Sequence, residues 1–110
     1  MAQDFERHIH RNIGSATPVR TANSDDAVIG IRVSNTHAST TVKVDAYIAS
    51  GGNDYYIIKN APVPAGGSLE LIDGGAKFVL QSGDALTIDA DASTSDWVVS
   101  SIDSISTYEI

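Results

Sequence analysis

The chain has 110 residues, no cysteine and a formal net charge of −7. This length fits a single domain with a small core. Without cysteine the chain has no disulfide, no thiolate zinc site and no cysteine nucleophile. The negative charge would repel a phosphate backbone, which argues against nucleic acid as a partner.

The apolar composition favours a thin, β-branched core. Hydrophobic residues make up 42% of the chain but aromatic residues only 6%, so packing depends mainly on Ala, Val and Ile. The N-terminal residues carry charges where a secretory signal has an apolar run, and no stretch reaches the roughly 20 apolar residues of a membrane span. We therefore expect no membrane partner and no export by a signal peptide.

Residues 1–26 are predicted to form an N-terminal arm or the first hairpin of the domain. From Phe5 to Ile13 the apolar spacing fits a short helix, but alternation with polar residues favours an extended strand. A second short strand is expected over 17–22, where Pro18 indicates a sheet edge or a strand start. Residues 1–20 hold three Arg against two acids, a net +1, and residues 21–110 hold four Lys or Arg against twelve acids, a net −8. A weakly basic arm therefore precedes an acidic body.

Strand signals follow one another from Ala27 onward. Residues 27–34 and 41–49 alternate between apolar and polar side chains, as half-buried strands do. Gly51 to Asp54 tolerate positive φ angles and predict a hairpin into the strand Tyr55–Lys59. Asn60–Gly67 is expected to be an extended connection, because its two prolines lock φ and its two glycines permit a sharp turn.

The remaining strands are separated by glycine and aspartate turns, including the turn at Gly74-Gly75. They are expected at residues 68–73, 77–80, 85–90 and 97–105. The resulting fold class is all-β: one antiparallel β-sandwich or small jelly roll of seven to nine strands with an N-terminal extended arm. The domain spans 27–105 and residues 106–110 form a C-terminal tail.

Three aspartates in the segment DADASTSD are the best candidate for a cation loop, because spaced carboxylates on a turn are ligands that Ca²⁺ takes. The match to an EF-hand loop is poor. With Asp89 as the first position, Thr94 and Ser100 stand where that loop needs glycine and glutamate. We therefore favour a solvated turn over Asp89–Asp96, with a structural cation as the alternative.

The histidines make a weak metal site. His8 and His10 share a face of a strand, a spacing that metal sites use, but a third ligand is missing and His37 lies in a separate polar loop. Exposed or interface histidines are the favoured interpretation, and an interface that buries them would make them protonation switches.

Motifs for catalysis are absent from the sequence. It contains no G-x-S-x-G elbow, and the adjacent carboxylates Asp25 and Asp26 point to opposite faces of an extended chain, which does not suit glycosidase chemistry. The glycine doublets at 51, 66 and 74 lack the lysine and helix start of a phosphate loop. We expect no enzyme activity and no cofactor.

Aromatic residues near the hairpin define a candidate ligand surface. Tyr47, Tyr55 and Tyr56, with Trp97, have the side chains that stack on sugars, and they would suit a carbohydrate-binding β-sandwich. Cross-strand packing is the favoured alternative use of these rings.

Residues Val28–Ile102 resemble a family of small structural proteins of tailed bacteriophages, over about two-thirds of the chain. The resemblance rests on the order and spacing of five segments. These are Ser34-Asn35-Thr36, Val42–Tyr47, Tyr56–Pro64, Gly67-Ser68-Leu69, and Lys77–Leu80 leading to Gly83-Asp84.

The resemblance implies a role in virion architecture, first as a capsid decoration or cementing protein, and otherwise in the neck, tail or fibre. It implies a location in the virion, assembled in the bacterial host cytoplasm, and partners that are other virion proteins and copies of the chain in a homo-oligomer. The arm then becomes a candidate docking strand. Its expected interface residues are Phe5, Arg7, Ile9, Arg11 and Ile13.

Overall fold

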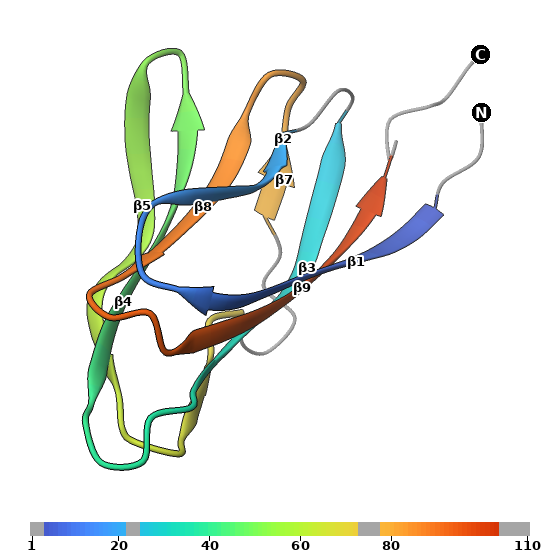
Figure 1. Cartoon of the computed structure of the whole chain (residues 1–110). Helices are drawn as coiled ribbons and strands as arrows, with labels where there is room; N and C mark the ends of the chain where they lie inside the picture. The colour runs from blue at the N-terminus through green and yellow to red at the C-terminus, as the bar shows by residue number, and fades with distance from the viewer. Residues whose placement is uncertain (1–3, 22–24, 73–77, 104–110) are drawn as a thin grey trace, which may run out of the picture.

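The computed structural model describes residues 4–21, 25–72 and 78–103, and over these ranges it contains β-strands and no helix. Its strands are β1 (Asp4–Ile13), β2 (Thr17–Thr21), β3 (Asp26–Asn35), β4 (Val42–Ser50), β5 (Asn53–Val63), β6 (Ser68–Glu70), β7 (Phe78–Leu80), β8 (Ala85–Ala90) and β9 (Ser95–Asp103). Figure 1 shows them packed as two sheets. The predicted all-β sandwich is confirmed.

The strand order is that of a jelly roll. Sheet A has the order β1-β9-β3-β6, with β7 also paired to β3, and sheet B has the order β2-β8-β4-β5. All strand pairs are antiparallel. Since β6 and β7 follow each other along the same side of β3, they act as one interrupted strand. Every other connection except the β4–β5 hairpin crosses between the sheets, which is the double Greek-key path of an eight-stranded jelly roll.

Small aliphatic side chains make the core, as the composition predicts. Val33 and Val99 from sheet A face Val44 and Ile88 from sheet B, and each is completely buried. Trp97 is the one large aromatic ring in this described core, with 1% of its surface exposed. The β-branched valine and isoleucine side chains suit this core because they pack well on the pleated surface of a sheet.

The N-terminal segment lies on the sandwich as two edge strands. β1 pairs with β9 at the edge of sheet A, and β2 pairs with β8 at the edge of sheet B. The two strands belong to different sheets, so they form no hairpin with each other. Figure 1 shows β1 running alongside β9, with the chain then turning back into β2.

The strand β5 is longer than the sequence pattern predicts. The hairpin turn at Gly51-Gly52 is confirmed, with both residues at positive φ. However, β5 continues to Val63, through the first half of the segment expected to be a connection. Pro62 is tolerated because β5 is an edge strand, where a missing N–H donor leaves no ladder bond unmade.

The predicted turn at Gly74-Gly75 and the predicted tail at 106–110 lie outside the described residues.

Candidate functional site: an exposed edge strand

The two faces of β1 are reversed relative to an ordinary edge strand. Phe5 and Ile9 point away from the core and have 78% and 58% of their surface exposed. Glu6 and His8, on the opposite face, are only partly exposed. A strand with one buried face normally turns its apolar side chains inward. The outward apolar side chains of β1 therefore depart from the usual pattern of a strand with one buried face.

Neighbouring residues on β9 extend this apolar surface. Ile9 lies opposite Val98, which is 43% exposed, and Phe5 lies opposite the partly exposed Ile102. Directly opposite residues of an antiparallel pair share a face. We call Phe5, Ile9 and Val98, together with the exposed Arg7 and Arg11, the outer patch.

One end of the outer patch is hollowed. An open depression of about 410 Å³ lies at the junction of β1 and β9. It is lined by Ile9, His10, Arg11, Asp96, Trp97 and Val98. The patch thus combines apolar side chains, cationic side chains and a shallow concave region, a combination that suits contact with another protein surface.

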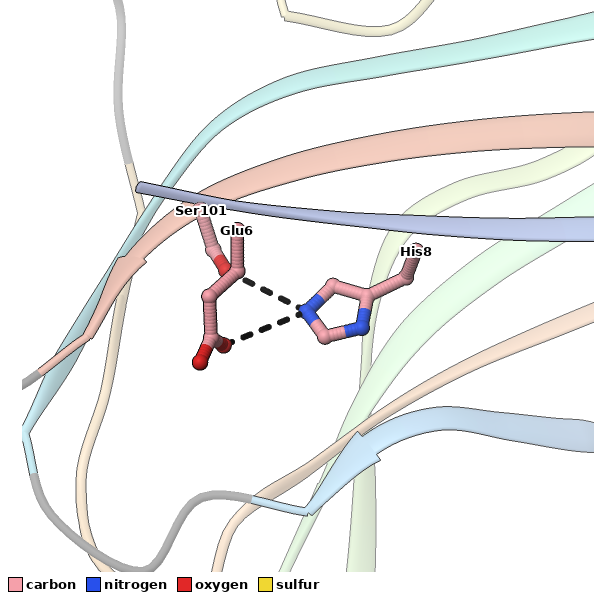
Figure 2. A network of polar contacts seen from close by, with 3 residues as sticks. All are labelled: Glu6, His8 and Ser101. Atoms are coloured by element: carbon pink, nitrogen blue, oxygen red, sulfur yellow. Dashed lines mark hydrogen bonds and ion pairs between the residues drawn. The ribbon is translucent and has the colours of Figure 1, made fainter. Parts of the chain in front are cut away.

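Polar contacts hold the opposite face of β1. Figure 2 shows Glu6, His8 and Ser101 gathered on the same side of β1 and β9. The Nε2 atom of His8 lies 3.3 Å from the Oγ atom of Ser101 and 3.7 Å from the Oε1 atom of Glu6. The contact with Glu6 is an ion pair only when His8 is protonated. These contacts favour the orientation of β1 that leaves Phe5 and Ile9 outside.

The C-terminal end of β1 is fixed to the body of the domain. Ser95, which is fully buried, donates a hydrogen bond of 2.6 Å to the Ile13 carbonyl and accepts one of 2.9 Å from the Trp97 indole. The Asn12 N–H donates to the Asp96 carboxylate at 3.0 Å. The strand is therefore part of the sandwich rather than a free arm.

The five predicted interface residues are divided between the surface and the core. Phe5, Arg7, Ile9 and Arg11 are exposed. Ile13 packs against the core of its own domain instead. The register of β1 against β9 shifts between His10 and Ile13, so a bulge turns Ile13 to the inner face.

The aromatic residues of the predicted ligand surface do not all lie on one face. Tyr47 and Tyr56 lie opposite each other across β4 and β5, with ring centroids 4.8 Å apart. The Nζ atom of Lys59 lies 4.4 Å from the Tyr56 ring centroid, within the range of a cation–π contact. Tyr55 is next to Tyr56 on a strand and so points to the other face, opposite Ile48. Buried Trp97 belongs to the core and not to this surface.

Acidic residues surround the Tyr47 hydroxyl. Burial raises the pKa of Tyr47 above its ordinary value of 10.0, and the carboxylate of Asp54, the neighbouring Tyr56 and the carboxylates of Asp89 and Asp45 raise it further. Each contribution disfavours the phenolate. This part of sheet B is therefore an acidic, aromatic surface, in contrast to the apolar and cationic outer patch on sheet A.

The aspartates of the candidate cation loop have separate partners. Asp91 accepts a hydrogen bond from the Lys43 N–H, Asp89 from the Ala90 N–H and Asp96 from the Asn12 N–H. Within residues 4–21, 25–72 and 78–103, no three His, Asp or Glu side chains come together in a group that could hold a metal ion. The contacts at these three carboxylates are those of capped turns and bulges.

The histidines have local structural contacts. His8 contacts Ser101 on the inner face of sheet A, and His10 lies opposite Trp97. The Nδ1 atom of His37 accepts hydrogen bonds of 3.0 Å from the N–H groups of Ser39 and Thr40, which closes the loop between β3 and β4.

The sequence pattern alone does not identify Val98 as an interface residue. Alternation in β9 indicates only that Val98 and Trp97 point to different faces of the strand. The missing information was the pairing of β9 with β1, in which paired residues are 82 or more positions apart along the chain. Val98 becomes part of the outer patch only through that long-range pairing.

No family model matches the sequence, and no curated protein matches it. Over the residues that the structure describes, no helix is long and apolar enough to cross a membrane.

Proposed function

We propose that this chain is a non-enzymatic structural protein of a tailed-bacteriophage virion that binds other virion proteins, with its place on the capsid surface as a decoration or cementing protein. The resemblance over Val28–Ile102 motivates the assignment to a virion. The jelly roll is compatible with it, because viral capsid proteins use this architecture, but lectins and cupins use it too. A fold alone does not select a function.

The observation that carries the proposal is the outer patch. Phe5 and Ile9 expose large apolar side chains on a sheet edge, where the free protein gains nothing from them. Covering such an edge in an assembly removes that apolar area from water and stabilises the bound state. The exposed Arg11 beside them suits a partner with acidic groups at the rim of the contact.

The alternative location in the virion is the neck, tail or fibre, where the chain would again be a structural protein. The same outer patch would serve there, since the association chemistry is the same and only the neighbouring protein differs. The expected partners in either place are other virion proteins and further copies of this chain.

Carbohydrate binding is the second candidate function, favoured by the adjacent rings of Tyr47 and Tyr56. Tyr56 is 46% exposed and so has ring surface available to a sugar. The divergent direction of Tyr55 reduces the width of this surface. A glycan array probed with the intact protein and with Tyr56→Ala tests it: binding that the substitution removes supports sugar recognition, and a blank array for the intact protein rejects it.

Incorporation into particles tests the virion proposal. One phage encodes the chain with Phe5→Ser and Ile9→Ser, and a second phage encodes the parent chain. The amount of the chain in purified particles of each phage is measured by mass spectrometry. These residues are exposed, so the folded domain should persist. A deletion of residues 2–22 is less informative because it removes two edge strands of the sandwich.

Val79→Ser is the matched control, because Val79 is an exposed apolar residue of sheet A on β7, away from β1. The proposal predicts that the parent and Val79→Ser chains are found in particles and that the double variant is lost from them. Absence of the parent chain from purified particles would reject the virion role.

A further inference from the structure

The four edges of the sandwich differ in how well they are protected against pairing with another strand. β6 and β7, at one edge of sheet A, have three residues each. β2 has five residues, contains Pro18 and shifts register beside it. β5 contains Pro62 and pairs with β4 through two register shifts. Short strands, prolines and bulges are the means by which proteins prevent edge-to-edge association.

β1 lacks these protections over most of its length. Residues Asp4 to His10 pair with β9 without a register shift and contain no proline. Among the strands that the structure describes, only β9 pairs with β1. β1 is thus the one described edge that is long, regular and lined by exposed apolar side chains, which points to pairing with a further strand.

We infer that β1 pairs antiparallel with β1 of a second copy of this chain, about a two-fold axis that passes through Arg7 and joins the two A sheets into one. This inference rests on the proposed association role and names its partner and register. In such an isologous pair, each contact occurs twice. The two-fold axis places Phe5 opposite Ile9 of the second copy and Glu6 opposite His8 of the second copy.

This register is favoured by the side chains on both faces. On the outer face an aromatic ring meets a β-branched side chain, a favourable cross-strand pair. The pairs then continue the rows of Val98 and Ile102 from each copy, since these residues lie opposite Ile9 and Phe5 within one chain. On the inner face a carboxylate meets an imidazole rather than another carboxylate.

Neighbouring registers are less favourable. An axis through Glu6 places Glu6 opposite itself, and an axis through His8 places Arg7 opposite Ile9 of the second copy. An inward Glu6 would also oppose pairing with an unrelated strand, because its charge would lie beside an uncharged or like-charged neighbour. The sequence of β1 thus favours its own copy over other strands.

The register has one unfavourable feature, which provides a test. Arg7 lies opposite Arg7 of the second copy, and like charges directly opposite are destabilising. Arg7→Thr should therefore strengthen the dimer by about two- to fivefold. If Arg7 instead contacts an acidic surface, such as the surface around Tyr47, the same substitution weakens association and overturns the inference.

Cysteine cross-linking tests the register directly, because the native chain has no cysteine. A residue on the two-fold axis lies about 4.5–5.5 Å from its own copy in Cα positions, within the span of a disulfide. Arg7→Cys should form a covalent dimer on mild oxidation in the full-length protein. Val79→Cys, on the other edge of sheet A, is the control and should form no covalent dimer under the same oxidation. Equal cross-linking at both positions would contradict the pairing.

Sedimentation equilibrium supplies the affinity. Ile9→Lys should weaken dimerisation by at least about tenfold, since each dimer loses two apolar pairs, whereas Val79→Lys should leave it unchanged. Circular dichroism of each variant verifies the fold. A parent chain that is monomeric at all concentrations, yet enters particles, would overturn the pairing and leave the virion role standing. A β1-linked dimer that is absent from particles would support the pairing and reject the virion role.

Discussion

Ile9 of β1 and Val98 of β9 lie directly opposite each other on the outer face of sheet A, with 58% and 43% of their surface exposed. An apolar pair at this position contributes little to the isolated domain, because much of its surface stays in contact with water. A contact that covered the pair would remove this apolar surface from water.

We predict that Ile9→Thr combined with Val98→Thr changes the free energy of unfolding of the monomer by no more than about 0.5 kcal/mol per site. Threonine keeps the β-branched shape that a strand favours. The measurement is urea denaturation at a protein concentration below that of dimerisation, because dimer formation adds stability by mass action. A loss of several kcal/mol would mean that the outer patch belongs to the core of the single chain.

Asn35 is predicted to be essential for stability at the end of the sandwich where β3 stops. It is 2% exposed, and its amide makes four hydrogen bonds. The partners are the carbonyls of Thr40 and Val63, the N–H of His37 and the hydroxyl of Thr94. Asn35→Ala should cost about 2–4 kcal/mol, because buried polar groups lose their partners.

The control for Asn35 is Thr36→Ala. The Thr36 hydroxyl donates an exposed hydrogen bond of 3.1 Å to the Thr94 carbonyl, which water can replace. Its loss should cost at most about 1 kcal/mol. Similar losses for the two variants in chemical denaturation would disagree with the role assigned to Asn35.

Gly14 is predicted to be intolerant of a side chain, because the chain passes close to Ser93 as it leaves β1. A Cβ atom on Gly14 would lie 2.5 Å from the Ser93 Oγ atom and 2.8 Å from its backbone nitrogen. Gly14→Ala should therefore destabilise the fold by roughly 1–3 kcal/mol. Gly30→Ala is the matched control, since its Cβ would have an ordinary contact of 3.8 Å with Ser100. Equal thermal stability of the two variants would contradict the close approach at Gly14.

Tyr47 is predicted to make stability depend on alkaline pH. Its pKa is raised in the folded state, chiefly by burial and then by the Asp54 carboxylate, so the folded chain keeps the phenolic proton where the unfolded chain loses it. The free energy of unfolding therefore falls as pH rises above the ordinary value of 10.0 and through the raised pKa. Below 10.0 this contribution is fully present.

Tyr47→Phe removes this titration. The variant should lose stability less steeply with pH in the alkaline range, and the absorbance of phenolate in the parent should contain a component above pH 10.0 that the variant lacks. Identical alkaline titrations of parent and variant would disagree with a partly buried, acidic environment for this hydroxyl.

Local patterns predict most of the fold. Alternation in the β3, β4, β8 and β9 segments identifies their inner faces, and the Gly51-Gly52 turn identifies the hairpin. Strand order depends on contacts between distant segments, which no local pattern contains. The sequence left sandwich and jelly roll open for that reason, and the pairing of β1 with β9 and of β2 with β8 is what distinguishes them.

The site could be predicted only in part. The sequence predicts Phe5 and Ile9 as anchors for a partner, and both are exposed. Ile13 has the same spacing, but the bulge at Asn12, which has a φ of 56°, reverses the side on which it lies. A bulge inserts one residue without changing composition, so side-chain periodicity cannot reveal it. Side-chain periodicity also fails to reveal the irregular pairing of β5 with β4. There, Asn60 adopts a φ of 54° and its N–H donates to the Asp45 carboxylate.

The proposed function requires that another protein surface covers the β1 edge in an assembled virion. A cryo-electron microscopy map of the intact particle, with this chain located in it, would show whether the edge is covered. Density for a neighbouring chain should lie along β1, with Phe5 and Ile9 enclosed. A map in which the chain is present with β1 open to solvent, or from which the chain is missing, would contradict it.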